Sequence, residues 1–334
     1  MKRLSSILFQ VDEACRFVED GRQEPLRVAL LLLDNAVELQ MDCAIRAELS
    51  DADLREKLRT LALEIPDAER PPDLQWLIDW KPLTRKQKAQ IDRTFNGKVD
   101  FLTSLPDKLD PAIRAPLKHL HQYRNQAYHR GHVRPATIAI ACRLLVEINC
   151  ELLLSLGRSG GTYASDEDYS WLEKRFGVRA AQALGDHALL QRAAEEMRRR
   201  VFVDRSALGV ALSDHLEARI TDLRSAIAFV VESTHFGSPG EVFRVSQFRS
   251  AVNRGEAPGA PVPPATYEPR CGLHVLDDLL ARLTEISATT GRIDAFRAYS
   301  ALETILELFE DDVHALASEV DRAIQWAVDI ARGK

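Results

Sequence analysis

Cysteine is scarce in this 334-residue chain, and no two cysteines form a CxxC pair. The five residues, Cys15, Cys43, Cys142, Cys150 and Cys271, are scattered along the sequence. Structural zinc sites, redox motifs and disulfide frameworks need cysteines at close and regular spacing. The sequence therefore predicts reduced and mostly buried thiols, and it excludes a disulfide-stapled scaffold.

A hydrophobic run long enough to cross a membrane is also missing. The longest run, "VALLLLDNAVEL" at Val28–Leu39, is interrupted by Asp34, Asn35 and Glu38. A membrane-spanning helix needs about 20 predominantly apolar residues. The N-terminal segment is too polar for a secretory signal. We therefore expect a cytoplasmic protein with no membrane partner.

The chain has no overall excess of basic residues. Its net charge is −6, with 44 lysines and arginines against 50 acidic residues. Proteins that bind nucleic acid over a wide face are usually basic. Contact with nucleic acid would have to depend on a local patch or on chemistry at a few phosphates. The hydrophobic content of 46% and the charged content of 28% are typical of globular domains, and the length allows two of them.

Strand-like alternation is scarce, and helical spacing of apolar residues covers most of the chain. Val242–Phe248 alternates, but it is short for a strand. We predict an all-α protein, in which Thr84 caps one helix that ends at Asn96-Gly97. The predicted helices cover about 5–19, 24–49, 51–64, 85–95, 111–130, 135–156, 178–202, 206–233, 273–289 and 292–331.

Two stretches rich in small residues divide the sequence. Residues 157–169 contain glycine and serine that break the helical pattern. They predict a helical bundle at 1–157, a linker at 158–177 and a C-terminal helical region at 178–334. Inside the last region, 236–272 is rich in glycine and proline and predicts a long loop.

One helix carries an unusual polar cluster, "YRNQAYHRGH" at Tyr123–His132. No acidic residue occurs between Pro111 and Val146. The resulting positive field favours an anion such as a phosphate. The alternative is a solvated face, or pairing with acids on a neighbouring helix. The basic residues of this stretch are Arg114, Lys118, Arg124, Arg130, Arg134 and Arg143.

The spacing inside this cluster suits chemistry on RNA. Asn125 and His129 are four residues apart and share a helix face. Arg124 lies about 140° from His129 around an ideal helix, a gap that a long arginine side chain can span. A histidine can move a proton to or from ribose and leaving oxygens. An arginine can stabilise the charge on phosphoryl oxygens, and Asn125 can position either group. No metal ion is needed.

A metal site is the alternative use of the four nearby histidines, His119, His121, His129 and His132. Only His129 and His132 can share a face, because His119 and His121 point about 200° apart. No carboxylate or thiol lies nearby in the sequence to complete a ligand set. We therefore predict neither a metal nor another cofactor, and we place His119 and His121 outside the reactive site.

The segment "RNQAYH", Arg124–His129, resembles the R-x4-6-H motif of HEPN domains. A polar residue directly after the arginine, here Asn125, is usual in that motif. The context is similar too, because "LLLLDNAVEL" at Leu30–Leu39 resembles the first long HEPN helix and an apolar helix follows the motif. The resemblance covers about residues 5–157, and residues 170–334 have no family assignment.

The resemblance implies a metal-independent endoribonuclease with Arg124 and His129 as the catalytic pair and Asn125 in support. Such enzymes often work as two-fold homodimers whose motifs face each other, and they occur in toxin–antitoxin and antiphage or stress-defence systems. The implied partners are RNA, a second copy of the chain and an antitoxin or regulatory protein. We assign RNA contacts to Tyr128, Arg130 and Lys118.

Two questions stay open from the sequence. Glu38 can support the site by pairing with Arg124, or it can form an ion pair elsewhere. The whole module can instead be a non-catalytic nucleotide- or protein-binding domain, or a structural dimerisation protein in which Arg124 and Asn125 only make interface hydrogen bonds.

Overall fold

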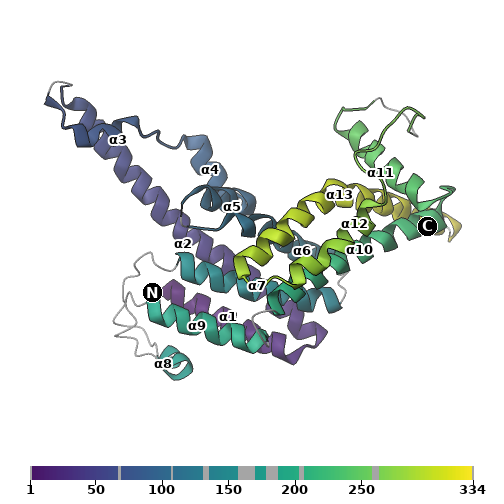
Figure 1. Cartoon of the computed structure of the whole chain (residues 1–334), viewed down its shortest axis with the longest axis horizontal. Helices are drawn as coiled ribbons and strands as arrows, with labels where there is room; N and C mark the ends of the chain where they lie inside the picture. The colour runs from purple at the N-terminus through teal and green to yellow at the C-terminus, as the bar shows by residue number, and fades with distance from the viewer. Residues whose placement is uncertain are drawn as a thin grey trace. The chain divides into compact units, whose positions relative to one another are not determined.

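The computed structural model describes residues 2–66, 69–106, 108–130, 135–156, 170–177, 187–202, 207–257 and 263–332. These ranges contain thirteen α-helices and no strand (Figure 1), which confirms the all-α prediction. The chain forms two compact units, residues 1–204 and 205–334.

The first unit contains nine of these helices. They are α1 (Lys2–Asp20), α2 (Gln23–Glu64), α3 (Gln75–Asp79), α4 (Arg85–Arg93), α5 (Phe95–Ser104), α6 (Arg114–Arg130), α7 (Pro135–Leu156), α8 (Ser170–Phe176) and α9 (His187–Val201). The second unit contains α10 (Ala207–Ser233), α11 (Pro239–Asn253), α12 (Val275–Ser287) and α13 (Arg292–Ala331).

The core of the first unit forms where α1, the first half of α2, α7 and α9 pack together. Apolar residues three or four apart on α2 are buried, from Leu26 through Leu30 and Leu33 to Val37. One buried polar contact sets the register of α2 against α7: Gln40 donates to Asn149 Oδ1 at 2.7 Å. The predicted packing of the two apolar segments in residues 5–157 is therefore confirmed.

Helix α2 is one continuous helix of 42 residues. The predicted break near residue 50 is wrong, because no glycine or proline interrupts the segment and Ala52 is buried within it. The helix ends where the guanidinium of Arg70 donates to the carbonyl oxygens of Ala62 (3.2 Å) and Ile65 (2.9 Å). Its second half projects beyond α1 and α7, with α3 beside its end (Figure 1).

Thr94 separates α4 from α5. Thr84 caps α4 as predicted, through a capping box with Gln87. The predicted stop at Asn96-Gly97 is wrong: α4 ends at Arg93, and Thr94 caps α5 by accepting from Gly97 N at 3.0 Å. A Cβ on Gly97 would lie 2.5 Å from Gln90 O. Glycine is therefore needed here for close packing and not for a turn.

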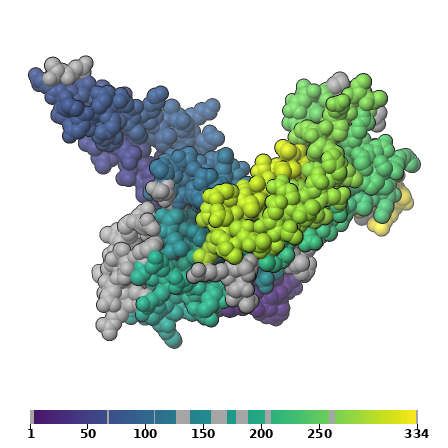
Figure 2. Space-filling view, viewed as in Figure 1, coloured from purple at the N-terminus to yellow at the C-terminus, as the bar shows by residue number. Residues whose placement is uncertain are grey.

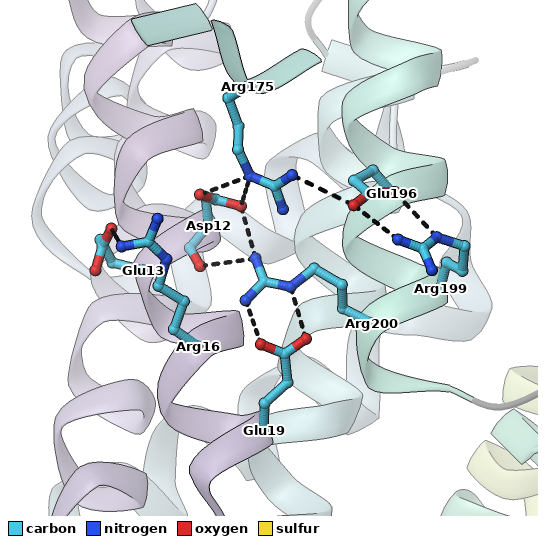
Figure 3. A network of polar contacts seen from close by, with 8 residues as sticks. All are labelled: Asp12, Glu13, Arg16, Glu19, Arg175, Glu196, Arg199 and Arg200. Carbon is cyan, nitrogen blue, oxygen red and sulfur yellow. Dashed lines mark hydrogen bonds and ion pairs between the residues drawn. The ribbon is translucent and has the colours of Figure 1, made fainter.

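Helices α8 and α9 belong to the first unit, although the sequence predicts a linker at 158–177 and a new domain from 178. Asp12 on α1 is buried and accepts from Arg175 Nε (3.0 Å) and Arg200 Nη1 (2.8 Å). Arg200 also pairs with Glu19 (Figure 3), and that hydrogen bond lowers the pKa of Glu19. These contacts tie α8 and α9 to α1, so the boundary between units falls near residue 204.

In the second unit α10 packs on α12 and α13, and α11 packs on α13. The predicted loop at 236–272 is wrong in its first half, because residues 239–253 form α11. Ser238 caps this helix by accepting from Glu241 N at 3.2 Å, and Pro239 occupies its first turn. The alternating segment Val242–Phe248 is therefore helical, with buried residues on most faces.

Helices α10 and α13 enclose a buried polar network. The hydroxyl of Tyr299 donates to Glu303 Oε1 at 2.9 Å, so its oxygen accepts from His215 Nδ1 (2.8 Å) and Arg219 Nη1 (3.2 Å). Arg219 also pairs with Glu303 and with Glu310. All five side chains are buried. Burial and the nearby Arg219 lower the pKa of His215 to about 3, so its imidazole is neutral at pH 7.

The cysteines are free thiols, and Cys15, Cys142 and Cys150 are buried as predicted. Burial raises the pKa of Cys15 to about 12, so this thiol is a poor nucleophile. No helix in the described ranges is both long enough and apolar enough to cross a membrane.

Candidate functional site

The helix that carries the polar cluster begins at a side-chain cap. Asp110 Oδ1 accepts from Ala112 N at 2.8 Å, and Pro111 begins a short 3-10 turn that leads into α6. This is the predicted start of the helix, and α6 then continues to Arg130. His121 and Arg124 are three residues apart on α6, and both face α2.

A buried carboxylate on α2 anchors both of these side chains. Asp34 has no exposed surface. Its Oδ2 accepts from Nε (2.7 Å) and Nη2 (2.6 Å) of Arg124, and its Oδ1 is 2.8 Å from Nδ1 of His121. Charge-assisted bonds of this kind are among the strongest that side chains make. Asp34 therefore fixes the position of the Arg124 guanidinium.

Arg124 keeps part of its donor set available. Nη1 donates to Asn125 Oδ1 at 2.6 Å, and 23% of the Arg124 side chain is exposed. A guanidinium has five N–H groups. Among the side chains that the structure describes, Asp34 accepts two of these N–H groups and Asn125 accepts one, which leaves one N–H on each terminal nitrogen. Two such donors in one plane match the oxygens of a phosphate.

His121 packs between the anchor and an aromatic ring. Its imidazole stacks on Phe95 of α5, with centroids 3.7 Å apart and planes 5° from parallel. Because the Asp34 carboxylate accepts hydrogen bonds, Nδ1 of His121 carries a proton. His121, placed outside the reactive site from the sequence, shares the Asp34 carboxylate with Arg124. Its small expected role in the reaction stays a prediction.

Glu38 does not contact Arg124. It lies one turn after Asp34 on α2 and accepts from Lys98 of α5 at 3.0 Å. Lys98 also pairs with Asp42 at 2.7 Å. Of the two possibilities left open by the sequence, the structure has the ion pair elsewhere, and Asp34 is the carboxylate that holds Arg124.

Acidic partners reduce the positive field of α6 near its start. Lys118 and Arg114 both donate to Oδ1 of Asp100, each at 2.6 Å. Burial raises the pKa of Asp100, but the hydrogen bonds from Lys118 and Arg114 outweigh it and lower the pKa below its ordinary value. Lys118, assigned to RNA binding, is thus paired with a carboxylate in the free protein.

The remaining predicted residues lie at the C-terminal end of α6. The backbone of Tyr128, His129 and Arg130 is helical, and their side chains lie outside the part of the chain that the structure describes. His132 lies outside it entirely. The structure therefore brings together Arg124 and Asn125 with Asp34 and His121.

Sequence reasoning missed Asp34 as the anchor and Phe95 as the stacking partner. A signal for Asp34 was present, because it follows the buried Leu33 within an apolar helix. A carboxylate on a buried helix face needs a cationic or hydrogen-bonding partner. Phe95 had no comparable signal, because stacking depends on how α5 packs on α6.

Comparison of the chain with protein-family models, with curated proteins and with solved structures gives no match.

Proposed function

We propose that this protein is a metal-independent endoribonuclease of the HEPN type, acting through Arg124, Asn125 and His129. The observation that carries the proposal is the anchored guanidinium. Asp34 holds one edge of Arg124, and both terminal nitrogens keep an N–H for a phosphate. A donor held in place before the substrate binds stabilises transition-state charge without a reorganisation cost. The resemblance of "RNQAYH" to the HEPN motif supports the same assignment.

The proposed reaction is an attack of a ribose 2′-hydroxyl on the adjacent phosphorus. The 2′-oxygen loses its proton and bonds to phosphorus, and the bond from phosphorus to the 5′-oxygen breaks. The leaving 5′-oxygen takes a proton. The products are a 2′,3′-cyclic phosphate and a 5′-hydroxyl. His129 transfers a proton, and Arg124 stabilises the charge that builds on the phosphoryl oxygens.

In this proposal the RNA lies along α6 from Lys118 to the C-terminal end of the helix. Tyr128 stacks on a base, Arg130 contacts a neighbouring phosphate, and Lys118 leaves Asp100 to contact another. A two-fold homodimer brings the two copies of His129 into one cleft. One histidine can then remove a proton while the other donates one.

The deciding experiment follows cleavage of single-stranded RNA with excess EDTA. We expect cleavage to continue, with 2′,3′-cyclic phosphate ends, and a substrate with 2′-deoxyribose at the cut site to resist. His129→Ala should slow cleavage by about 10²–10⁴-fold and Arg124→Ala by about 10²–10³-fold. Arg124→Lys should fail as well, because a single ammonium cannot bind Asp34 and a phosphate in one plane. Loss of activity in EDTA would refute the proposal.

A second candidate is a non-catalytic module. The observation in its favour is the same ion pair. The contact of Asp34 with Arg124 and His121 joins α2 to α6, and this structural role alone accounts for the three residues. A module of this kind would leave RNA intact, and Arg124→Ala would weaken folding without affecting any reaction.

The proposed biological role is a toxin or a defence effector, with residues 205–334 selecting the target, sensing a signal or binding an antitoxin or regulatory protein. Expression of the wild-type chain should then arrest growth and degrade cellular RNA, whereas His129→Ala should do neither. Equal growth of both strains at equal protein levels would contradict this role.

A further inference from the structure

The projecting half of α2 has an apolar stripe that no described residue covers. Leu54, Leu58 and Leu61 are 56%, 44% and 57% exposed, and Ile65 follows at the end of the helix. The three leucines are separated by four and three residues, which is the spacing of successive d, a and d positions of a coiled coil, and Ile65 is the extended residue directly after the helix. Exposed leucines on one stripe mark an interaction surface.

The other side of the same segment is already occupied. Arg59 donates to Ile78 O of α3 at 3.0 Å, and Lys88 of α4 pairs with Asp53 at 2.7 Å. Helices α3 and α4 therefore contact this segment away from the stripe. The arm is defined here as residues 51–65 of α2 with α3 and α4, at the upper left of Figure 2. Within it, the three leucines give the stripe its apolar surface.

We infer that the stripe binds the same stripe of a second copy of this chain, in antiparallel orientation. In that pairing Leu58 faces the partner's Leu61, and Leu54 lies near the end of the partner's helix. Each contact occurs twice about the two-fold axis, so the interface is closed and self-complementary. The inference concerns α2 alone and does not depend on the proposed ribonuclease activity. This contact is separate from the two-fold contact proposed at His129, and one chain can make both.

Charge complementarity favours this occupant and this orientation. Lys57 and Glu64 are both exposed and lie beside the stripe at equivalent heptad positions. In the antiparallel pair Lys57 faces the partner's Glu64, and the contact occurs twice. In a parallel pair Asp51, one heptad before Leu58, would face the partner's Asp51 at the seam, and like charges would oppose association.

The orientation also suits the position of the bundle. The core positions of α2 in the bundle run from Leu26 to Ile45, and the helix ends at Glu64. Antiparallel pairing therefore places the two bundles at opposite ends of the paired arms, whereas parallel pairing places them at the same end. The seam is short and buries less than the roughly 1,600 Å² of a typical stable interface. We expect self-association with a micromolar dissociation constant.

The test is sedimentation of the full chain across a series of concentrations. Leu58→Glu places a charge in the seam and should weaken self-association by about tenfold or more. Leu63→Glu is the matched control: Leu63 is 45% exposed but lies on the opposite side of the helix, and its change should leave association unaltered. Circular dichroism checks that both variants stay folded.

Charge exchange tests the orientation. Lys57→Glu and Glu64→Lys should each weaken association several-fold, and the double variant should restore it. A wild-type chain that stays monomeric at hundreds of micromolar would overturn the inference, and so would equal effects of Leu58→Glu and Leu63→Glu. Association unchanged by Leu58→Glu would place the contact elsewhere. A double variant as weak as the singles would exclude antiparallel pairing. RNA cleavage by the same samples reports separately on the proposed activity.

Discussion

Asp34 and Arg124, 90 positions apart in the chain, form an ion pair in which the carboxylate has no exposed surface and the guanidinium is partly exposed. The pair has two consequences. It joins α2 to α6, and it orients the outer N–H groups of Arg124 away from Asp34. Its structural and chemical roles can be separated by changing one partner at a time.

Removing the carboxylate should destabilise the first unit. Asp34→Ala leaves Arg124 and His121 without their buried acceptor, and loss of one partner of a buried pair costs about 3–5 kcal/mol. Because Arg124 can turn toward water, we expect the low end of that range in urea unfolding. The control is Asp53→Ala, which breaks a surface pair with Lys88 and should cost less than about 1 kcal/mol. Equal costs for the two variants would contradict the anchoring role of Asp34.

Asn125 allows a test of charge at the proposed site. Its Oδ1 accepts from Arg124 Nη1 at 2.6 Å. Asn125→Ala removes this contact and should reduce RNA cleavage mildly. Asn125→Asp keeps the contact but adds a second carboxylate to the same guanidinium, which repels phosphate. Steady-state cleavage should therefore be slower for Asn125→Asp than for Asn125→Ala. The reverse order would mean that Asn125 acts only by positioning Arg124.

Much of the fold could be predicted because its signals are local. Asp110 with Pro111 and Thr84 with Gln87 are caps that act within a single turn, and the structure has helices at both. The failures occur where packing outweighs local composition. Gly97 suggests the end of a helix, but it lies inside α5, where the backbone packs closely against Gln90. The Gly/Pro-rich composition of 236–272 suggests a loop, but residues 239–253 form a helix that Ser238 caps.

From the sequence, the only part of the candidate site that could be predicted was the pair Arg124 and Asn125 on α6. Arg124 and Asn125 are neighbours in the sequence, so their association needs no tertiary information. Asp34 and Phe95 come from other helices, and their contacts depend on how α2 and α5 pack against α6. The same limit applies to α9, whose place in the first unit depends on the contact of Arg200 with Asp12.

The network that holds α8 and α9 on α1 predicts that removing the Asp12 carboxylate lowers the free energy of unfolding strongly, whereas removing the neighbouring Glu13 carboxylate lowers it little. Asp12 is buried and accepts from Arg175 and Arg200 (Figure 3). Asp12→Ala should lower the free energy of unfolding by about 3 kcal/mol. The matched control is Glu13→Ala. Glu13 pairs with Arg16 on the helix surface, and this change should cost less than about 0.5 kcal/mol. Hydrogen exchange in α9 should increase for Asp12→Ala alone, and unchanged exchange there would exclude the proposed tie.

The buried histidine of the second unit predicts a pH-dependent stability. The pKa of His215 is lowered to about 3 in the folded chain, by burial first and then by Arg219, against an ordinary value of 6.5. Between these values the unfolded chain binds the extra proton, so His215 stabilises the fold above pH 6.5 and this contribution is lost as pH falls toward 3. Glu303 acts in the opposite direction, because burial raises its pKa to about 7 and the folded chain then binds the extra proton.

A variant that removes only the histidine separates the contribution of His215 to the pH dependence of stability from that of Glu303. His215→Asn keeps a side-chain N–H for Tyr299 but cannot be protonated. The wild type should therefore lose stability relative to this variant as pH falls below 6.5, by about 1.4 kcal/mol per pH unit at most. The measurement is hydrogen exchange in α10 and α13 of the full chain, with the variant compared to the wild type at each pH. His274→Asn, at an exposed histidine of the same unit, is the control for loss of one imidazole and should not reproduce the trend. A constant difference between wild type and His215→Asn from pH 7 to pH 4 would show that the pKa of His215 is the same in the folded and unfolded chain, and that burial and Arg219 do not lower it.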